Sequence, residues 1–223
     1  MDVASPWRHE VVDILVVAAV VIDLMLVTST RMATAIRLNA MQAAVLALMP
    51  LVIARSPWEP HILGVAAAIL IIRVLVMPPM LMWSIRHATV RREEGPLIGI
   101  GPSLVIAGGL VGLSFLLGDR LRLPEGLLPF STILVPGAFA TILLGLFLLI
   151  TRVQALTQVV AYLTIENGIY LFGLALVRET PVIVEMGILL DVFVGVFVMG
   201  IIIFHINRTL EHLDTSGLSQ LRD

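Results

Sequence analysis

The chain of 223 residues contains no cysteine, and all 14 of its basic residues are arginine, so lysine is absent as well. Without thiols the chain cannot hold an iron–sulfur cluster or a thiolate zinc site, form a disulfide or use a cysteine nucleophile. Charged residues are also scarce at 13%, whereas hydrophobic residues reach 59% and the mean hydropathy is +1.04. This composition excludes a soluble globular domain and predicts a chain that lies in a lipid bilayer.

Sequence motifs of a self-contained enzyme are missing too. The chain has no glycine-rich phosphate loop, no zinc-protease His-Glu motif and no serine nucleophile motif. Its net charge of −2 gives no electrostatic attraction to nucleic acid. We therefore expect no metal, no redox cofactor and no catalysis by this chain alone, since its histidines also lack metal-ligand spacing: His9, His61, His87, His205 and His212.

Most of the chain is divided among seven apolar segments, at residues 11–29, 34–53, 61–82, 99–117, 131–150, 157–177 and 182–206. A helix needs about 20 apolar residues to cross the hydrocarbon core, and each segment is close to that length. The connections are short and most contain prolines or arginines, so they leave no room for a soluble domain. The sequence predicts an all-α polytopic membrane protein with about seven transmembrane helices.

Arginines between the segments predict the orientation of the chain. With seven spans, the side that holds the C-terminus collects eight arginines and the other side five. Cytoplasmic loops of membrane proteins carry the excess of basic residues. We therefore expect a protein of the bacterial inner membrane with a periplasmic N-terminus and a cytoplasmic C-terminus.

Two carboxyl groups fall near the middle of predicted spans. Glu166 lies nine residues into the segment 157–177, and Asp191 nine residues into the segment 182–206. A charge at this depth costs at least ~2.5 kcal/mol, so a lone carboxyl is expected to stay protonated until a charge or water approaches. Such groups suit ion translocation, and Glu166 and Asp191 form the candidate site. The alternative is that they make structural hydrogen bonds between helices.

Three further residues are candidates for supporting this site. Tyr162 and Tyr170 lie four residues to either side of Glu166, which places two hydroxyl groups on its helical face. They are predicted to donate hydrogen bonds to the carboxyl group, and the alternative is that they pack in the interior. His205 follows Asp191 by 14 residues on nearly the same face. It is either a proton relay toward cytoplasmic water or an ordinary residue at a helix end.

Arg73 is a permanent cation inside the segment 61–82, just before Met77, Pro78 and Pro79. A buried guanidinium has to be paired, because an unpaired charge in hydrocarbon is prohibitive. The two prolines cannot continue the helical hydrogen bonds, so they are expected to kink the helix and free carbonyl groups near Arg73. Asp23, in the first segment, is the preferred partner. The pair is either a structural ion pair or part of an ion relay.

The last two segments and the residues just before them carry a specific pattern. TRVQALTQVVAYLTIENGIYLFGLAL and VIVEMGILLDVFVGVFVMGIIIFHI resemble the K subunit of bacterial complex I. The match rests on Glu166 followed by Asn167, and on Asp191 three residues before the pair Val194-Gly195. Asp191 stands where that family usually has Glu. Over its whole length the chain is similar to the hydrogenase-4 component E family, which looks like a K subunit with extra N-terminal helices.

This resemblance implies both a division of the chain and a function. Residues 1–130 would form a four-helix membrane extension, residues 131–206 a K-like three-helix unit, and residues 207–223 a cytoplasmic tail. The implied protein is a membrane-arm subunit of a nickel–iron hydrogenase complex related to complex I. In it, Glu166 and Asp191 would help to move protons or ions while electrons flow in other subunits.

Partner subunits are expected because ion movement against a gradient needs an energy source, and this chain has no motif that supplies one. The faces lined by Gly108 and Gly112, and by Gly187 and Gly195, are candidates for contact with other membrane subunits. Two alternatives stay open. One is a structural scaffold subunit, and the other is a K-like subunit of a multi-subunit sodium/proton antiporter, which usually has only three helices.

Overall fold

A computed structural model of the chain describes residues 6–53, 60–87, 97–121, 131–176 and residue 195. Helices make up the fold throughout these ranges, and no β-strand occurs in them. The elements in chain order are α1 (Pro6–Thr28), α2 (Met32–Ile53), α3 (Pro60–Ile69), the π-helix η1 (Leu70–Val76), α4 (Met77–His87), α5 (Ile100–Arg120), α6 (Leu134–Thr151) and α7 (Ala155–Leu176). The predicted all-α class is confirmed.

Six of the predicted spans correspond to helices that are long and apolar enough to cross a membrane. The third span consists of α3, η1 and α4, which follow one another without a break. The predicted seventh span, 182–206, lies outside the described residues except for Gly195. The protein is therefore a polytopic membrane protein.

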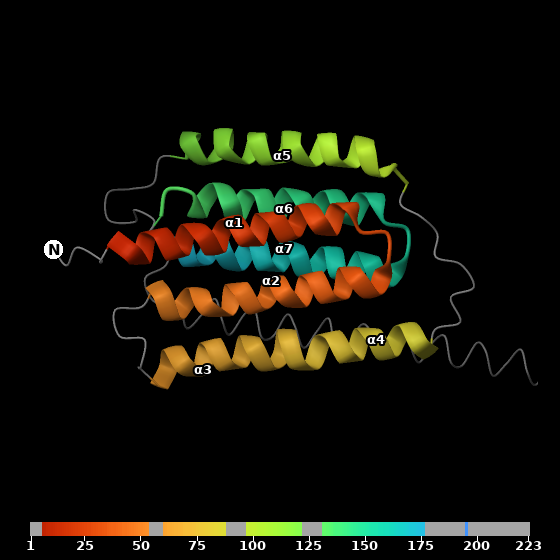
Figure 1. Ribbon diagram of the computed structural model, residues 1–223, viewed down its shortest axis with the longest axis horizontal. Helices are drawn as coiled ribbons and strands as arrows, with labels where there is room; N and C mark the ends of the chain where they lie inside the picture. Colours follow the sequence, from red (N-terminus) through yellow and green to blue (C-terminus); the bar gives the residue numbers. More distant parts are fainter. Residues whose placement is uncertain (1–5, 54–59, 88–96, 122–130, 177–194, 196–223) are drawn as a thin grey trace, which may run out of the picture.

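The helices lie side by side in the order shown in Figure 1. The apolar helix α5 forms one edge and packs on α6 and α1, while the third span forms the opposite edge and packs on α2. Helices α1, α2, α6 and α7 fill the space between these edges. Among the described helices, these four build the interior of the bundle, and each edge helix has one side free of contact with the described residues.

Glycine allows α6 and α7 to approach each other closely. A methyl group at Gly145 of α6 would lie 2.8 Å from the backbone nitrogen of Ile165 in α7. In return, a methyl group at Gly168 of α7 would lie 2.8 Å from the backbone nitrogen of Ile142 in α6. Such distances are too short for any side chain, so the two glycines are what permits this contact between backbones.

The turn between α6 and α7 is tied to the turn between α1 and α2. Arg152 donates hydrogen bonds to the carbonyl oxygens of Val27 at 3.0 Å and Ser29 at 2.7 Å, at the C-terminal end of α1. Burial lowers the pKa of the Arg152 guanidinium, which stays charged at neutral pH because its ordinary pKa is so high. A cation at a helix C-terminus is favourable. The two turns share one end of the bundle, as the predicted topology requires.

The prolines of the third span are accommodated by a π-helical segment. The predicted kink at Pro78 and Pro79 is not seen, because the chain stays helical through both prolines. On their N-terminal side, the N–H of Met77 bonds to the carbonyl oxygen of Ile72, five residues earlier. The wider turn takes up the missing α-helical bonds, and the third span appears as one continuous rod in Figure 1. Arg73 lies inside this π-helical segment.

Candidate functional site

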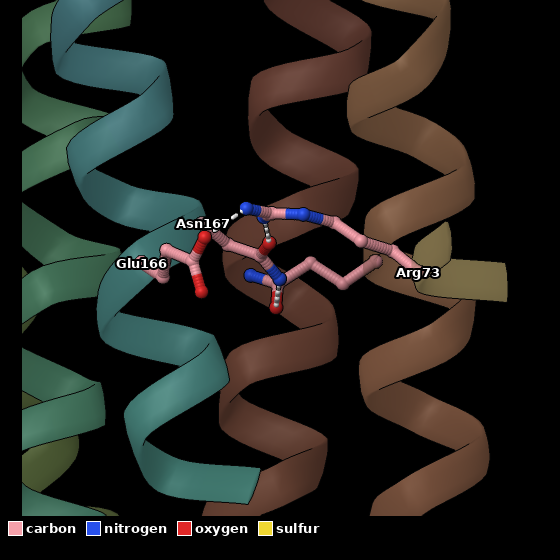
Figure 2. A network of polar contacts seen from close by, with 4 residues as sticks. Arg73, Glu166 and Asn167 are labelled. Atoms are coloured by element: carbon pink, nitrogen blue, oxygen red, sulfur yellow. Dashed lines mark hydrogen bonds and ion pairs between the residues drawn. The ribbon is translucent and has the colours of Figure 1, made fainter. Parts of the chain in front are cut away.

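Arg73 and Glu166 form an ion pair in the interior of the bundle. The Nη2 atom of Arg73 contacts Oε1 of Glu166, and its Nη1 atom donates a hydrogen bond of 2.6 Å to Oδ1 of Asn167. The side chains of Arg73 and Glu166 are only 9% and 4% exposed. Figure 2 shows the Arg73 side chain reaching from the third span to the face of α7 that carries both partners. Glu166 therefore faces the protein interior.

The predicted pairing of Arg73 with Asp23 is wrong, although Arg73 does pair with an acid. Helix α1, which carries Asp23, packs on α2, α5 and α6, and α2 in turn packs against η1. Asp23 therefore has α2 between itself and Arg73, whereas Glu166 on α7 lies within reach of Arg73. The cost of an unpaired charge predicts that a partner exists, but it does not say which helices are neighbours.

The polar contacts continue from Asn167 to Asp23. Asn167 donates through Nδ2 to Oε1 of Gln42 in α2 at 3.0 Å, and Gln42 donates through Nε2 to Oδ1 of Asp23 at 2.7 Å. Asp23 and Gln42 are completely buried, and Asn167 is 1% exposed. A buried polar chain, defined as Glu166, Arg73, Asn167, Gln42 and Asp23, thus crosses the bundle from the third span to α1.

Sequence reasoning missed Gln42 and the second amide of α2, Asn39. Asn39 donates to Oγ1 of Thr164 in α7 at 3.3 Å, which adds another polar contact between the same two helices. A usable signal was present, because Asn39 and Gln42 are the only side-chain amides in α2 and their spacing of three residues places them on one helical face. Amides facing lipid would lose their hydrogen bonds, so this face predicts an interior position.

Asp23 has one satisfied and one unsatisfied carboxyl oxygen. Oδ1 accepts the bond from Gln42, whereas Oδ2 is buried and has no hydrogen-bond partner in the part of the chain that the structure describes. The hydroxyl of Thr141 in α6 adjoins the carboxyl group and is likewise without a hydrogen bond among these residues. No salt bridge to Asp23 occurs within the described ranges.

The two tyrosines do not both act as predicted. Tyr170 is buried in an apolar cluster with Leu134 and Leu171, and its hydroxyl makes no hydrogen bond within the described residues. The predicted bond from Tyr170 to Glu166 is therefore absent. Helical spacing places the two residues on one face, but this spacing alone does not produce a hydrogen bond between the hydroxyl and the carboxyl group. Tyr162 is half-buried beside a second apolar cluster.

Asp191 and His205 lie outside the described residues, so their predicted roles stay predictions. From the same predicted span, Gly195 is described, and a methyl group added there would lie 3.9 Å from the terminal methyl of Met80 in α4. Among the residues with described positions, no three histidine, aspartate or glutamate side chains gather as a metal site would require.

Comparison with known proteins supports a relationship over most of the chain. The sequence is 35% identical over 190 residues to the uncharacterized protein Rv0085 of Mycobacterium tuberculosis, covering 84% of this chain and 85% of that protein. It is 29% identical over 159 residues to hydrogenase-4 component E of Escherichia coli K12, covering 70% and 72%, and the component of the same name from Shigella flexneri matches equally well. No family model matches the chain, and no solved structure matches it.

Proposed function

This chain belongs to the same family as the mycobacterial protein Rv0085, and on that premise, together with its similarity to hydrogenase-4 component E, we propose that it is a membrane subunit of a complex I-related hydrogenase. Within that complex Glu166 takes part in moving protons or ions. The complex lies in the bacterial inner membrane, with the N-terminus of this chain on the periplasmic side.

The observation that carries this proposal is the buried pair of Arg73 and Glu166. Glu166 lies 11 residues after the start of α7 and 10 before its end, which is roughly 15 Å from either end at ~1.5 Å per residue. An ion pair at the centre of a bilayer is costly to build and adds little net stability. Its presence therefore favours a functional role over a purely structural one.

The pair has two charge states that differ by one proton. Arg73 stays protonated in both, because its guanidinium does not release a proton in a protein. When a proton binds the Glu166 carboxylate, its ion pair with Arg73 is broken. When the proton leaves, the attraction is restored. A charge that arrives nearby can therefore drive proton binding or release at Glu166.

The N-terminal extension supplies the cation to this site. Arg73 comes from the third span, whereas Glu166 and Asn167 come from the proposed K-like unit. The first two helices of that unit, α6 and α7, make the most extensive contact between elements of the structure. Asp191, which lies outside the described residues, is the second carboxylate of the proposal.

Helix α5 offers a surface for the partner subunits that this function requires. Gly108, Gly109 and Gly112 are exposed, and a methyl group at any of them would meet no atom of the described residues within 4 Å. In a bilayer, an open face of small residues allows the backbone of another helix to approach closely. This supports the proposal that α5 contacts another membrane subunit of the complex.

Replacing Glu166 with Gln in the assembled complex tests the proposal. Glutamine keeps the size of the side chain and an oxygen that accepts from Arg73, so we expect normal amounts of complex and reduced ion movement per electron transferred. The matched control is Asp13→Asn, at a half-buried carboxyl near the start of α1 that accepts from Ser131. Unchanged ion movement in Glu166→Gln would refute the role of Glu166, and loss of the complex would favour a structural scaffold.

A further inference from the structure

The hydrogen bonds of the buried polar chain all point in the same direction. Arginine has only donor groups, so the oxygen of Asn167 must face Arg73. The amide nitrogen of Asn167 is then directed at Gln42, which must accept through its oxygen. The nitrogen of Gln42 is in turn directed at Asp23. The donor at one end thus fixes the orientation of both amides, and Asp23 receives the last bond.

Within the described part of the chain, Arg73 is therefore connected to two carboxyl groups. It contacts Glu166 directly, and it reaches Asp23 through two aligned amide dipoles. Hydrogen bonds arranged in series polarise one another, so the positive charge of Arg73 is felt at the far end of the chain. One cation cannot neutralise two carboxylates, and an excess negative charge in the centre of a bilayer is costly.

Among the described residues, no other charged group forms a salt bridge with Asp23. Of the titratable residues on the elements packed around α1, Arg37 on α2 is exposed, and Asp119 and Arg120 lie at the C-terminal end of α5. Helix α6 contains no titratable residue. On α1 itself the other titratable residues belong to its first eight positions, more than two turns away from Asp23. Asp23 is completely buried, and its second oxygen lacks a partner among the described residues.

We propose that Asp23 is a second proton-binding residue of this site and that it shares the charge of Arg73 with Glu166. In the resting protein Glu166 is ionised and Asp23 carries a proton. When a proton binds Glu166, the charge of Arg73 acts on Asp23 through the buried polar chain, and Asp23 releases its own proton. Each conversion takes up one proton at Glu166 and releases one at Asp23, so the number of bound protons and the net charge stay the same.

The buried polar chain transmits charge and is not the route of the proton. Side-chain amides do not accept and release protons as carboxyl groups and water do, so Gln42 and Asn167 cannot pass one along. Glu166 and Asp23 each exchange a proton with water at their own end of the buried polar chain. The protonation of Asp23 can be tested on this protein alone, and only its role in transport rests on the proposed function.

Infrared spectroscopy of the full chain in lipid nanodiscs, with the aspartate carboxyl groups labelled with ¹³C, tests the inference. At neutral pH the unsubstituted protein should show the carbonyl band of a protonated, labelled aspartate. Because Asp191 is a second candidate for such a band, the band should remain in Asp191→Asn and be lost in Asp23→Asn. The control Asp13→Asn should leave it unchanged.

Two further variants test the connection with Glu166. In Glu166→Gln the charge of Arg73 is no longer shared with the carboxylate of Glu166, so the band of protonated Asp23 should be lost. Adding Gln42→Met, which replaces the amide with an apolar side chain of similar length, should restore that band. An unchanged Asp23 band in Glu166→Gln would show that Asp23 and Glu166 do not share the charge of Arg73.

If Asp23→Asn does not fold, the spectra of the unsubstituted protein and of Asp191→Asn still show whether Asp23 is protonated. Absence of a labelled protonated-carboxyl band both in that protein and in Asp191→Asn would show that Asp23 is ionised, which overturns the inference. These spectra need no partner subunit. A complex that still moves ions through Glu166 while Asp23 is ionised would leave the proposed function standing and refute only the inference.

Discussion

Helices α5 and α7 are nearly equal in length, at 21 and 22 residues, yet they occupy opposite environments. In the apolar stretch that would cross the membrane, 72% of α7 is buried inside the structure, whereas for α5 the value is 17%. Both helices are apolar enough to cross a membrane. Lipid tails are as apolar as leucine, so hydrophobicity places a helix in the membrane without placing it inside the protein. Polar groups that need partners decide the interior position.

The glycines of the two regions show the same contrast. Gly145 and Gly168 are enclosed between α6 and α7, while Gly108, Gly109 and Gly112 of α5 face open space among the described residues. Glycine thus permits a close helix contact between α6 and α7, whereas in α5 it leaves an open surface among the described residues. The following substitutions test this contrast, from the largest expected effect to the smallest.

Replacing Arg73 with Met should have the largest effect. It leaves Glu166 without its cation in the interior, and breaking a buried pair in this way costs ~3–5 kcal/mol in soluble proteins. The free energy of unfolding, measured in mixed micelles with a denaturing detergent, should fall by that order. In the double variant Arg73→Met, Glu166→Gln most of the loss should be recovered. Equal losses in the single and double variants would contradict the importance of the pair.

A methyl group at the α6–α7 contact should have the next largest effect. In Gly145→Ala the new carbon meets the backbone of α7, so the helices must move apart, at a cost of ~1–3 kcal/mol. Gly109→Ala in α5 is the matched control, because it meets no described atom and should not destabilise the isolated chain. Thermal unfolding of both variants in detergent checks this. Equal destabilisation would show that the enclosed and open glycines do not differ.

The bond between Asn39 and Thr164 should contribute less. Asn39→Leu removes one interhelical hydrogen bond, worth ~0.6–1.7 kcal/mol in membrane proteins. Thr164 is not left unsatisfied, because its hydroxyl also donates to the carbonyl oxygen of Val160 at 3.0 Å. The same unfolding measurement should therefore show a small loss of stability. A loss as large as that of Arg73→Met would mean that α2 and α7 are held together mainly by this bond.

Gly108→Leu should leave the stability of the chain itself nearly unchanged, since the side chain enters open space. In the complex it should block the approach of another helix and lower the recovery of partner subunits during purification in mild detergent. Val105→Leu, on an exposed neighbouring position of α5, is the control. Full recovery of partners with Gly108→Leu would exclude this face of α5 from the interface.

Much of the fold could be predicted from the sequence because each span is a local property. The six described spans match the predicted segments, since about 20 apolar residues in a row have few alternatives to a membrane helix. The interior position of Glu166, and the need of Arg73 for an acidic partner, could also be predicted. Both follow from the cost of exposing a charge to lipid, which depends on the residue and its depth alone.

Contacts between helices were not predictable in the same way. Asp23 and Glu166 both satisfy the rule that Arg73 needs a carboxylate, and only the packing of α2 between α1 and η1 decides between them. Tyr170 has the right helical spacing to reach Glu166, but its hydroxyl makes no hydrogen bond among the described residues. The role of Gln42 depends on three helices meeting, which no pattern within α2 reveals.

The sequence by itself determined that this protein is a helical membrane protein, where its described spans lie and which charged groups must be hidden from lipid. Each of these depends on the free energy of transferring one residue or one segment into hydrocarbon, and that quantity can be summed along the chain. Only the tertiary structure decided that Glu166 pairs with Arg73 and that two amides connect this pair to Asp23. Helices in a bilayer choose their neighbours by close packing and by directional hydrogen bonds, which act between segments far apart in the sequence.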